Sequence, residues 1–136
     1  MPLSRFLGTG LAVPDRVVTN DDLSQLMDTS DQWIRERTGI RERRWVREGE
    51  TGSQLALTAS TRAIEAAGIA PAEVEAIVYA SSTPDHFAPG NGVYLQRELG
   101  AGPIPAIDIR TQCSGFVYAL AVADGWIRMR KKCLQI

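Results

Sequence analysis

The chain has 136 residues, of which 44% are hydrophobic and 23% charged. This composition disfavours intrinsic disorder and fits one domain over residues 1–136. A net charge of −1 disfavours a generally basic nucleic-acid-binding protein. The apolar runs are too short to cross a bilayer, and the first residues lack the apolar core of a signal peptide. Two cysteines and one histidine offer neither a disulfide framework nor a zinc site. We therefore expect a cytoplasmic, reduced protein without a metal ion.

Strand and helix signals alternate along the chain. Apolar runs with turn-forming neighbours predict strands at residues 5–8, 76–80 and 104–109, the last only if Pro105 lies at its start or edge. Capping residues and apolar spacing predict helices from Asn20, from Thr29 or Ser30 to Arg37, and over residues 53–67, 91–99 and 114–130. Helix ends are expected at Gly39, Gly68 and Gly100. This alternation predicts an α/β fold, with helices on the faces of a parallel or mixed sheet.

Cys113 lies where the third predicted strand turns into the last helix. In such folds ligands bind beyond the carboxyl ends of the strands. A thiol at a helix N-terminus is favoured as thiolate, and the free N–H groups there suit an oxyanion. Gly115 is expected to allow a tight turn and to leave room for a substrate. The helix is apolar nearly all round over residues 116–123, so we expect it in the middle of a protein. The alternative is an inert, buried structural cysteine.

Two long motifs resemble those of a known enzyme family. Residues 108–124 read Asp-x-x-x-x-Cys-Ser-Gly-Phe-x-Tyr-Ala-Leu-x-x-Ala-Asp. This segment resembles the nucleophile segment of β-ketoacyl-acyl-carrier-protein synthase III, a condensing enzyme of the thiolase fold. Residues 28–43 are similar to the family's coenzyme A-binding stretch, and weaker matches extend the resemblance over about residues 5 to 129. The resemblance implies that the chain is the N-terminal half of a duplicated, thiolase-like α/β fold with a mixed sheet.

The resemblance also implies a reaction. The cysteine matching Cys113 accepts an acyl group from an acyl-CoA primer, and malonyl-acyl-carrier protein then decarboxylates and attacks the acyl-enzyme to give a β-ketoacyl product. The implied partners are acyl-CoA, malonyl-acyl-carrier protein and a second copy in a homodimer. No permanently bound cofactor, nucleic acid or membrane is implied.

In the family, coenzyme A is bound by residues that match Thr29, Trp33 and Arg37. Positions i and i+4 share a helix face, so the indole and the guanidinium can flank one ligand. An indole stacks on adenine, and a guanidinium offers several donors to phosphate. The alternatives are a core tryptophan and a solvated arginine face, the latter above all for Arg41, Arg43, Arg44 and Arg47.

Phe87 lies close to the position where the family sends a phenylalanine across its dimer interface into the partner's acyl pocket. A plain surface-loop aromatic is the alternative. The neighbouring His86 does not match the family's catalytic histidine, which lies in the C-terminal half.

Two departures from the family stand out. Arg110-Thr111-Gln112 replaces small apolar residues, which suggests a different primer preference. The chain is also less than half as long as family members, whose second half supplies a histidine, an asparagine and part of the oxyanion hole. The ending looks like a truncation or a change of reading frame, and we expect it to leave an apolar face uncovered and to prevent condensation by this chain alone. A non-catalytic CoA-binding or assembly fragment is therefore the alternative function.

Overall fold

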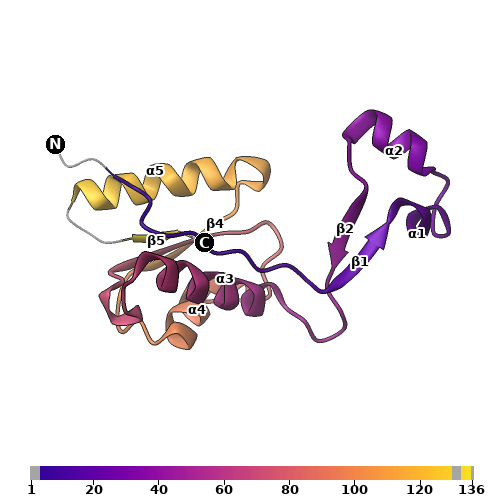
Figure 1. Ribbon diagram of the computed structural model, residues 1–136. Coiled ribbons are helices and arrows are strands. Elements are labelled where there is room, and N and C mark those ends of the chain that lie inside the picture. Colours follow the sequence, from indigo (N-terminus) through magenta and orange to yellow (C-terminus); the bar gives the residue numbers. More distant parts are fainter. Residues whose placement is uncertain (1–3, 130–132, 136) are drawn as a thin grey trace. The chain divides into compact units, whose positions relative to one another are not determined.

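The structure, a computed structural model, describes residues 4–129 and 133–135 (Figure 1). They fall into two compact units, one of residues 4–12 with 51–129 and 133–135 and the other of residues 13–50. Each is built around its own sheet.

The first unit contains a parallel sheet with the strand order β4-β3-β5. Its strands are β3 (Ala76–Ala80), β4 (Ala106–Ile109) and β5 (Cys133–Gln135). The predicted strand at 76–80 is confirmed. The next strand begins at Ala106 because Pro105 has no N–H for a ladder, although its carbonyl accepts from the N–H of Ile77 at 2.9 Å. The strand β5 was not predicted from the sequence.

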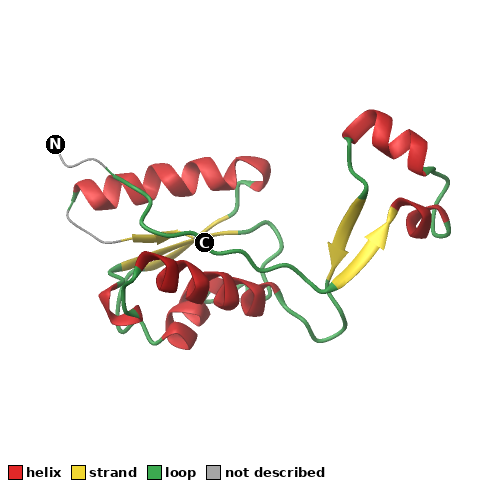
Figure 2. Ribbon diagram, viewed as in Figure 1, coloured by secondary structure: helices red, strands yellow, loops and turns green. Residues whose placement is uncertain are grey.

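Helices cover both faces of this sheet. The helices α3 (Gly52–Ala67) and α4 (Asn91–Leu99) lie on one face and α5 (Gly115–Arg128) on the other (Figures 1 and 2). Short 3₁₀ turns lie at η1 (Pro71–Glu73) and η2 (Gln112–Ser114). The predicted helix 53–67 begins one residue earlier, because Thr51 caps it, and the predicted helix 91–99 is confirmed. The predicted end of the last helix, residue 130, lies outside the described residues.

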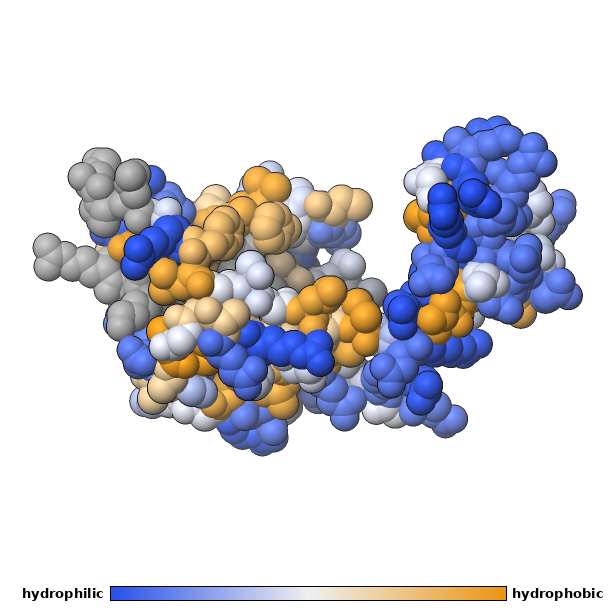
Figure 3. Space-filling view, viewed as in Figure 1, coloured by the Kyte–Doolittle hydropathy of each residue, from blue (hydrophilic) through white to orange (hydrophobic). Residues whose placement is uncertain are grey.

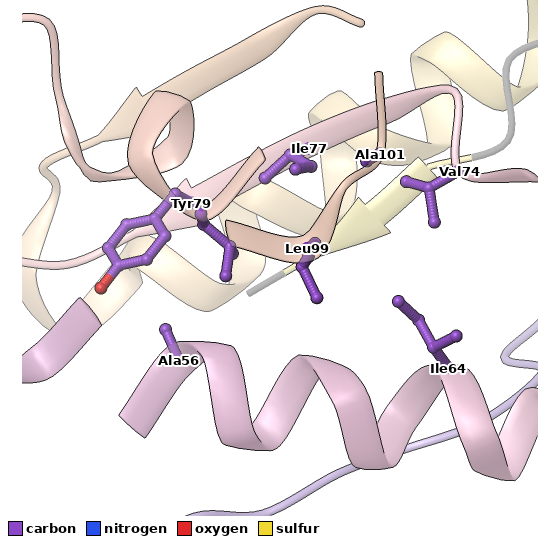
Figure 4. Packing of buried hydrophobic residues seen from close by; sticks show 8 residues of the cluster. Ala56, Ile64, Val74, Ile77, Tyr79, Leu99 and Ala101 are labelled. Atoms are coloured by element: carbon purple, nitrogen blue, oxygen red, sulfur yellow. The ribbon is translucent and has the colours of Figure 1, made fainter. Parts of the chain in front are cut away.

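Two apolar clusters hold these layers together, one on each face of the sheet. Figure 4 shows side chains of α3, of β3 and of the C-terminal end of α4 pointing toward one another. This larger cluster consists of Ala56, Ile64, Val74, Ile77, Tyr79, Leu95, Leu99 and Ala101. The smaller one joins β3 to α5 through Val78, Ala119 and Ala123. The α/β architecture is therefore confirmed.

The apolar helix α5 is not enclosed. The side chains of Phe116, Val117 and Tyr118 are 63%, 65% and 55% exposed, and Figure 3 shows apolar residues gathered over this helix. The expectation of a helix buried on all sides is wrong for this chain. Among the described residues, only the face that carries Ala119 and Ala123 packs on the sheet.

The strand predicted at residues 5–8 is not formed. The segment instead lies against α3, where Gly8 and Gly10 come so close that a Cβ atom at either position would overlap backbone atoms of the helix. Packing of main chain on main chain takes the place of a strand ladder there.

Replacing Gly10 by alanine is expected to lower the free energy of unfolding by about 1–3 kcal/mol, the usual cost of overpacking. The matched control is Gly125→Ala in α5, because a Cβ atom at Gly125 meets no neighbouring atom within 4 Å. That control is expected to raise stability by about 0.5–1 kcal/mol, since alanine is the better helix former. Urea unfolding followed by circular dichroism measures both. Equal changes in the free energy of unfolding of the two variants would contradict the close packing of Gly10 on α3.

The second unit contains an antiparallel ladder between β1 (Arg16–Thr19) and β2 (Glu42–Trp45), with α1 (Asn20–Ser24) and α2 (Asp31–Thr38) between them. Ser30 caps α2 and Gly39 ends it at a φ of 73°, as predicted. The cap of α1 is Thr19, not Asn20, because Thr19 and Asp22 form a capping box.

Candidate active site

Cys113 lies in η2, in the turn between β4 and α5, and it is a free, exposed thiol. The exposure does not match the alternative of a buried structural cysteine. The preceding residue, Gln112, has a φ of 47°, a left-handed value that is uncommon for a residue other than glycine. Such strained backbone is concentrated at functional sites, because it persists only where surrounding structure enforces it.

The turn differs in detail from the one expected. The helix α5 begins two residues after Cys113, and the N–H groups of Ser114 and Gly115 already bind the carbonyls of Thr111 and Gln112. They are therefore not free for an oxyanion in this structure. Gly115 has helical φ and ψ angles of −52° and −45°, so the turn does not use the freedom of glycine.

Thr111 was expected to matter only as part of the Arg110-Thr111-Gln112 departure from the family. Its hydroxyl is buried without a hydrogen-bond partner among the described residues. An unpaired buried hydroxyl costs about 1–3 kcal/mol, and such an atom calls for an explanation. The sequence marked Thr111 by its place in that departing tripeptide, two residues before the cysteine, but gave no sign that its hydroxyl is buried.

Asp108, the first residue of the nucleophile motif, joins β4 to the start of α4. Its carboxylate accepts hydrogen bonds from the N–H groups of Asn91 at 2.9 Å and Gly92 at 3.2 Å. The Asn91 amide also donates to the Tyr79 hydroxyl at 3.1 Å. Burial raises the pKa of Tyr79, so this hydroxyl stays neutral. The network fixes the end of β4 beside α4.

The loop at residues 81–90 is held at several points. The Asp85 carboxylate accepts from the N–H of Ser53 at 2.7 Å, and the N–H of His86 donates to the Asn91 side chain at 2.9 Å. The His86 ring stacks on Tyr94 with a centroid separation of 3.8 Å. Phe87 projects from this loop and is 76% exposed.

Trp33 and Arg37 meet on α2, as their spacing predicted. The guanidinium carbon lies 4.9 Å from the indole centroid, and Trp33 is 53% exposed. Trp33 is therefore not a core residue. Thr29 is half-buried in the segment just before the cap of α2. These three residues belong to the second unit, and Cys113 and Phe87 to the first.

Asn20 organises the second unit, a role that the sequence did not reveal. It is 1% exposed, and its amide donates to Asp31 and to the carbonyl of Ile40, both at 2.8 Å. Arg43 donates to the Asn20 side chain at 2.6 Å and to the carbonyl of Val18 at 3.2 Å. Arg43 therefore serves an internal network rather than a solvated face, and the network fixes the start of α2.

Asp31 makes this network sensitive to acid. The hydrogen bond from Asn20 lowers the pKa of Asp31, and Arg35 lowers it further. The stabilisation is present while the carboxylate is charged and disappears as the pH falls through the lowered pKa. The stability advantage of the wild type over Asp31→Asn is therefore expected to shrink as the pH falls from about 5 to about 2. Urea unfolding at several pH values measures the difference in the free energy of unfolding between the wild type and Asp31→Asn. A difference that does not change with pH would contradict the stabilising role of the charged Asp31 carboxylate.

The described residues offer neither a cluster of metal-binding side chains nor a membrane-spanning helix. No group of three or more histidine, cysteine, aspartate or glutamate residues could hold a metal ion in residues 4–129 and 133–135. No helix in the same part of the chain is long and apolar enough to cross a membrane.

Comparison with known proteins identifies the relatives of this chain. No protein-family model matches it. The β-ketoacyl-acyl-carrier-protein synthase III of Laribacter hongkongensis is 48% identical over 128 residues, which are 94% of this chain and 40% of that protein. The chain matches the N-terminal part of a β-ketoacyl-acyl-carrier-protein synthase III.

Solved synthase III structures support this match. The enzyme from Aquifex aeolicus superposes with a TM-score of 0.91 at 40% identity, over 95% of this chain and 42% of that one. The enzyme from Thermus thermophilus gives a TM-score of 0.86 at 38% identity, over 93% of this chain and 39% of that one. The thiolase-like fold class is confirmed, and the chain spans about 40% of the length of the curated relatives it matches.

Proposed function

We propose that this chain carries the acyl-accepting part of a β-ketoacyl-acyl-carrier-protein synthase III. The observation that carries the proposal is the exposed Cys113 thiol, on a strained turn after β4, in a chain that matches this enzyme. The Cys113 thiolate attacks the carbonyl carbon of an acyl-CoA thioester. A bond forms between that carbon and Sγ, the bond to the CoA sulfur breaks, and CoA leaves as a thiolate that takes up a proton.

Condensation is the second step of the proposed reaction. Malonyl-acyl-carrier protein loses CO₂, and its carbanion attacks the Cys113 thioester to release the β-ketoacyl product and the free thiol. The histidine and asparagine that the family uses here have no counterpart in residues 1–136, whose single histidine is His86. We place them in the second half of the complete enzyme. We also propose that residues 1–136 form a single N-terminal domain. The complete enzyme is proposed to be a homodimer located in the cytoplasm.

Coenzyme A is proposed to bind at Trp33, Arg37 and Thr29. Arg37 lies over the indole of Trp33, which is half-exposed and so has surface left for an adenine ring. The guanidinium at the same place can donate to phosphate oxygens. We assign Phe87 to the acyl pocket, reached across the dimer interface.

Substituting Trp33 by alanine is expected to weaken CoA binding by about 1–3 kcal/mol, the usual contribution of stacking between a base and an aromatic ring. Isothermal titration with CoA measures it. The matched control is Trp45→Ala, because Trp45 lies in the same unit and also has an arginine, Arg16, 5.4 Å from its ring centroid. Equal losses in the two variants would contradict the assignment of Trp33.

A non-catalytic CoA-binding or assembly fragment is the second candidate. The exposed residues Phe116, Val117 and Tyr118 favour it, because a helix face of this kind suits assembly more than catalysis by this chain alone. The release of free CoA separates the candidates. The purified chain is mixed with short acyl-CoA thioesters, and free CoA is followed with a thiol reagent. One equivalent of CoA per chain supports the enzyme, whereas CoA binding without release supports the fragment.

A further inference from the structure

The carboxylate of Asp108 fastens the end of β4 to the start of α4. It accepts from the N–H of Asn91 at 2.9 Å and from the N–H of Gly92 at 3.2 Å, so a strand residue caps the helix. The loop before α4 also presses on this carboxylate, because a Cβ atom at Gly90, whose φ is 115°, would overlap it. Asp108 is therefore fixed by its side chain as well as by the strand ladder.

The main chain at the end of β4 is held by its neighbours. Ile109 is the last residue in the parallel register of β3 and β4. Its carbonyl accepts from the N–H of Ser81 at 3.2 Å. The Nη2 of Arg110 adds a long, exposed hydrogen bond to the carbonyl of Phe87 at 3.4 Å. The strand is thus fixed up to the point at which the turn begins.

The other end of the turn is fixed by α5. Gly115, the first residue of this helix, is buried, and a Cβ atom there would lie 3.5 Å from the Cβ atom of Ala80 at the end of β3. The helix packs on the same sheet through the smaller apolar cluster. Residues 110–114 therefore connect two fixed ends, and among them Gln112 adopts the left-handed φ of 47°. This φ is unfavourable for a residue with a side chain.

We propose that Asp108 is a positioning residue for Cys113. Its hydrogen bonds to α4 hold the end of β4 in the place that keeps Gln112 left-handed and presents the thiol to the acyl thioester. The effect passes through the main chain, because the thiol lies in the turn that follows the strand. The proposal rests on the proposed function for its reaction. A strained φ persists only where the surrounding structure enforces it, so loss of the Asp108 contacts lets Gln112 relax.

Double-variant cycles test whether Asp108 enforces the strain. Gln112→Gly removes the strain, and in the wild-type background it is expected to raise the equilibrium constant for folding by about threefold or more. Asp108→Asn keeps the size of the side chain but replaces one acceptor oxygen by an NH₂ group. The turn is then already relaxed, so Gln112→Gly is expected to give no gain in that background. Urea unfolding followed by circular dichroism measures each variant.

Asp85 supplies the matched control, because its carboxylate caps α3 in the same way. It accepts from the N–H of Gly52 at 3.1 Å and from the N–H of Ser53 at 2.7 Å. It lies in the loop after β3, and not on the strand that leads to the thiol. In the Asp85→Asn background, Gln112→Gly is expected to give the same gain as in the wild type. Equal gains in the Asp85→Asn and Asp108→Asn backgrounds would overturn the proposal.

The rate at which Cys113 accepts an acetyl group from acetyl-CoA reports the placement of the thiol. Each variant is assayed in buffer in which circular dichroism shows it to be folded. Asp108→Asn is expected to lower the rate about tenfold or more, because a small misplacement of a reacting group is costly. Thr51→Ala, which removes the cap of α3 in the same unit, is expected to keep the wild-type rate. Equal rates in these two variants would overturn the proposal.

A second variant covers the case in which Asp108→Asn does not fold. Asp108→Ser keeps one acceptor for the helix N–H groups, and serine is a good helix cap. Its side chain is too short to hold the strand end in the same place. Asp108→Ser is therefore expected to show the same missing gain from Gln112→Gly and the same slow acetyl transfer.

The two measurements separate this proposal from the proposed function. If the wild type accepts no acetyl group while Gln112→Gly stabilises only the chains with an intact Asp108, the proposed function fails and the control of the turn by Asp108 stands. If the wild type and Asp108→Asn accept an acetyl group equally fast, the positioning role fails and the proposed function stands.

Discussion

Cys113→Ser is expected to stop acyl transfer from acyl-CoA to this chain. The thiolate is a strong nucleophile near neutral pH, whereas a serine hydroxyl needs a base to activate it. The single histidine, His86, stacks on Tyr94. The rate of CoA release is therefore expected to fall about a thousandfold or more, a size typical of the loss of a nucleophile.

The second cysteine supplies the control for this experiment. Cys133→Ser leaves Cys113 in place and is expected to release CoA at the wild-type rate. A slow but equal release in both serine variants would mean that neither thiol is the acceptor. Circular dichroism of the variants shows whether the secondary structure is kept.

Ile77→Ala is expected to lower the free energy of unfolding by about 2–5 kcal/mol, the usual cost of truncating a buried aliphatic side chain. Ile77 is 0% exposed at the centre of the larger cluster, where α3, β3 and α4 meet (Figure 4). Little of the lost volume can be refilled, because the neighbouring residues are held by the sheet and by both helices.

Ile77→Val provides a graded control for the core. It removes one methylene and is expected to cost about 0.5–1.5 kcal/mol. Urea unfolding followed by circular dichroism measures both variants. A cost for Ile77→Ala no larger than that for Ile77→Val would contradict the placement of this side chain in the core.

Elements with strong local signals were predictable from the sequence. The run at 76–80 is apolar throughout because β3 is covered on both faces, and Ser30 and Gly39 mark the ends of α2 by their own chemistry. Cys113 was found because a motif marks it, and its place between β4 and α5 follows from the order of elements.

Features that depend on distant contacts were not predictable. The strand β2 is rich in charged residues and resembled a solvated arginine cluster, although its pairing with β1 makes it a strand. Residues 5–8 have the composition of a strand, but the close approach of Gly8 to α3 decides their conformation. The contact between Arg110 and Phe87 joins residues 23 positions apart, so no local pattern indicates it.

Peptide mapping after incubation with acetyl-CoA tests the central claim most directly. Trypsin cleaves after Arg110 and Arg128, so Cys113 lies in a peptide separate from Cys133. The peptide that begins at Thr111 is predicted to gain one acetyl group, which neutral hydroxylamine removes as it does any thioester. An unmodified peptide, or an acetyl group on a different one, would contradict the assignment of Cys113 as the acyl acceptor.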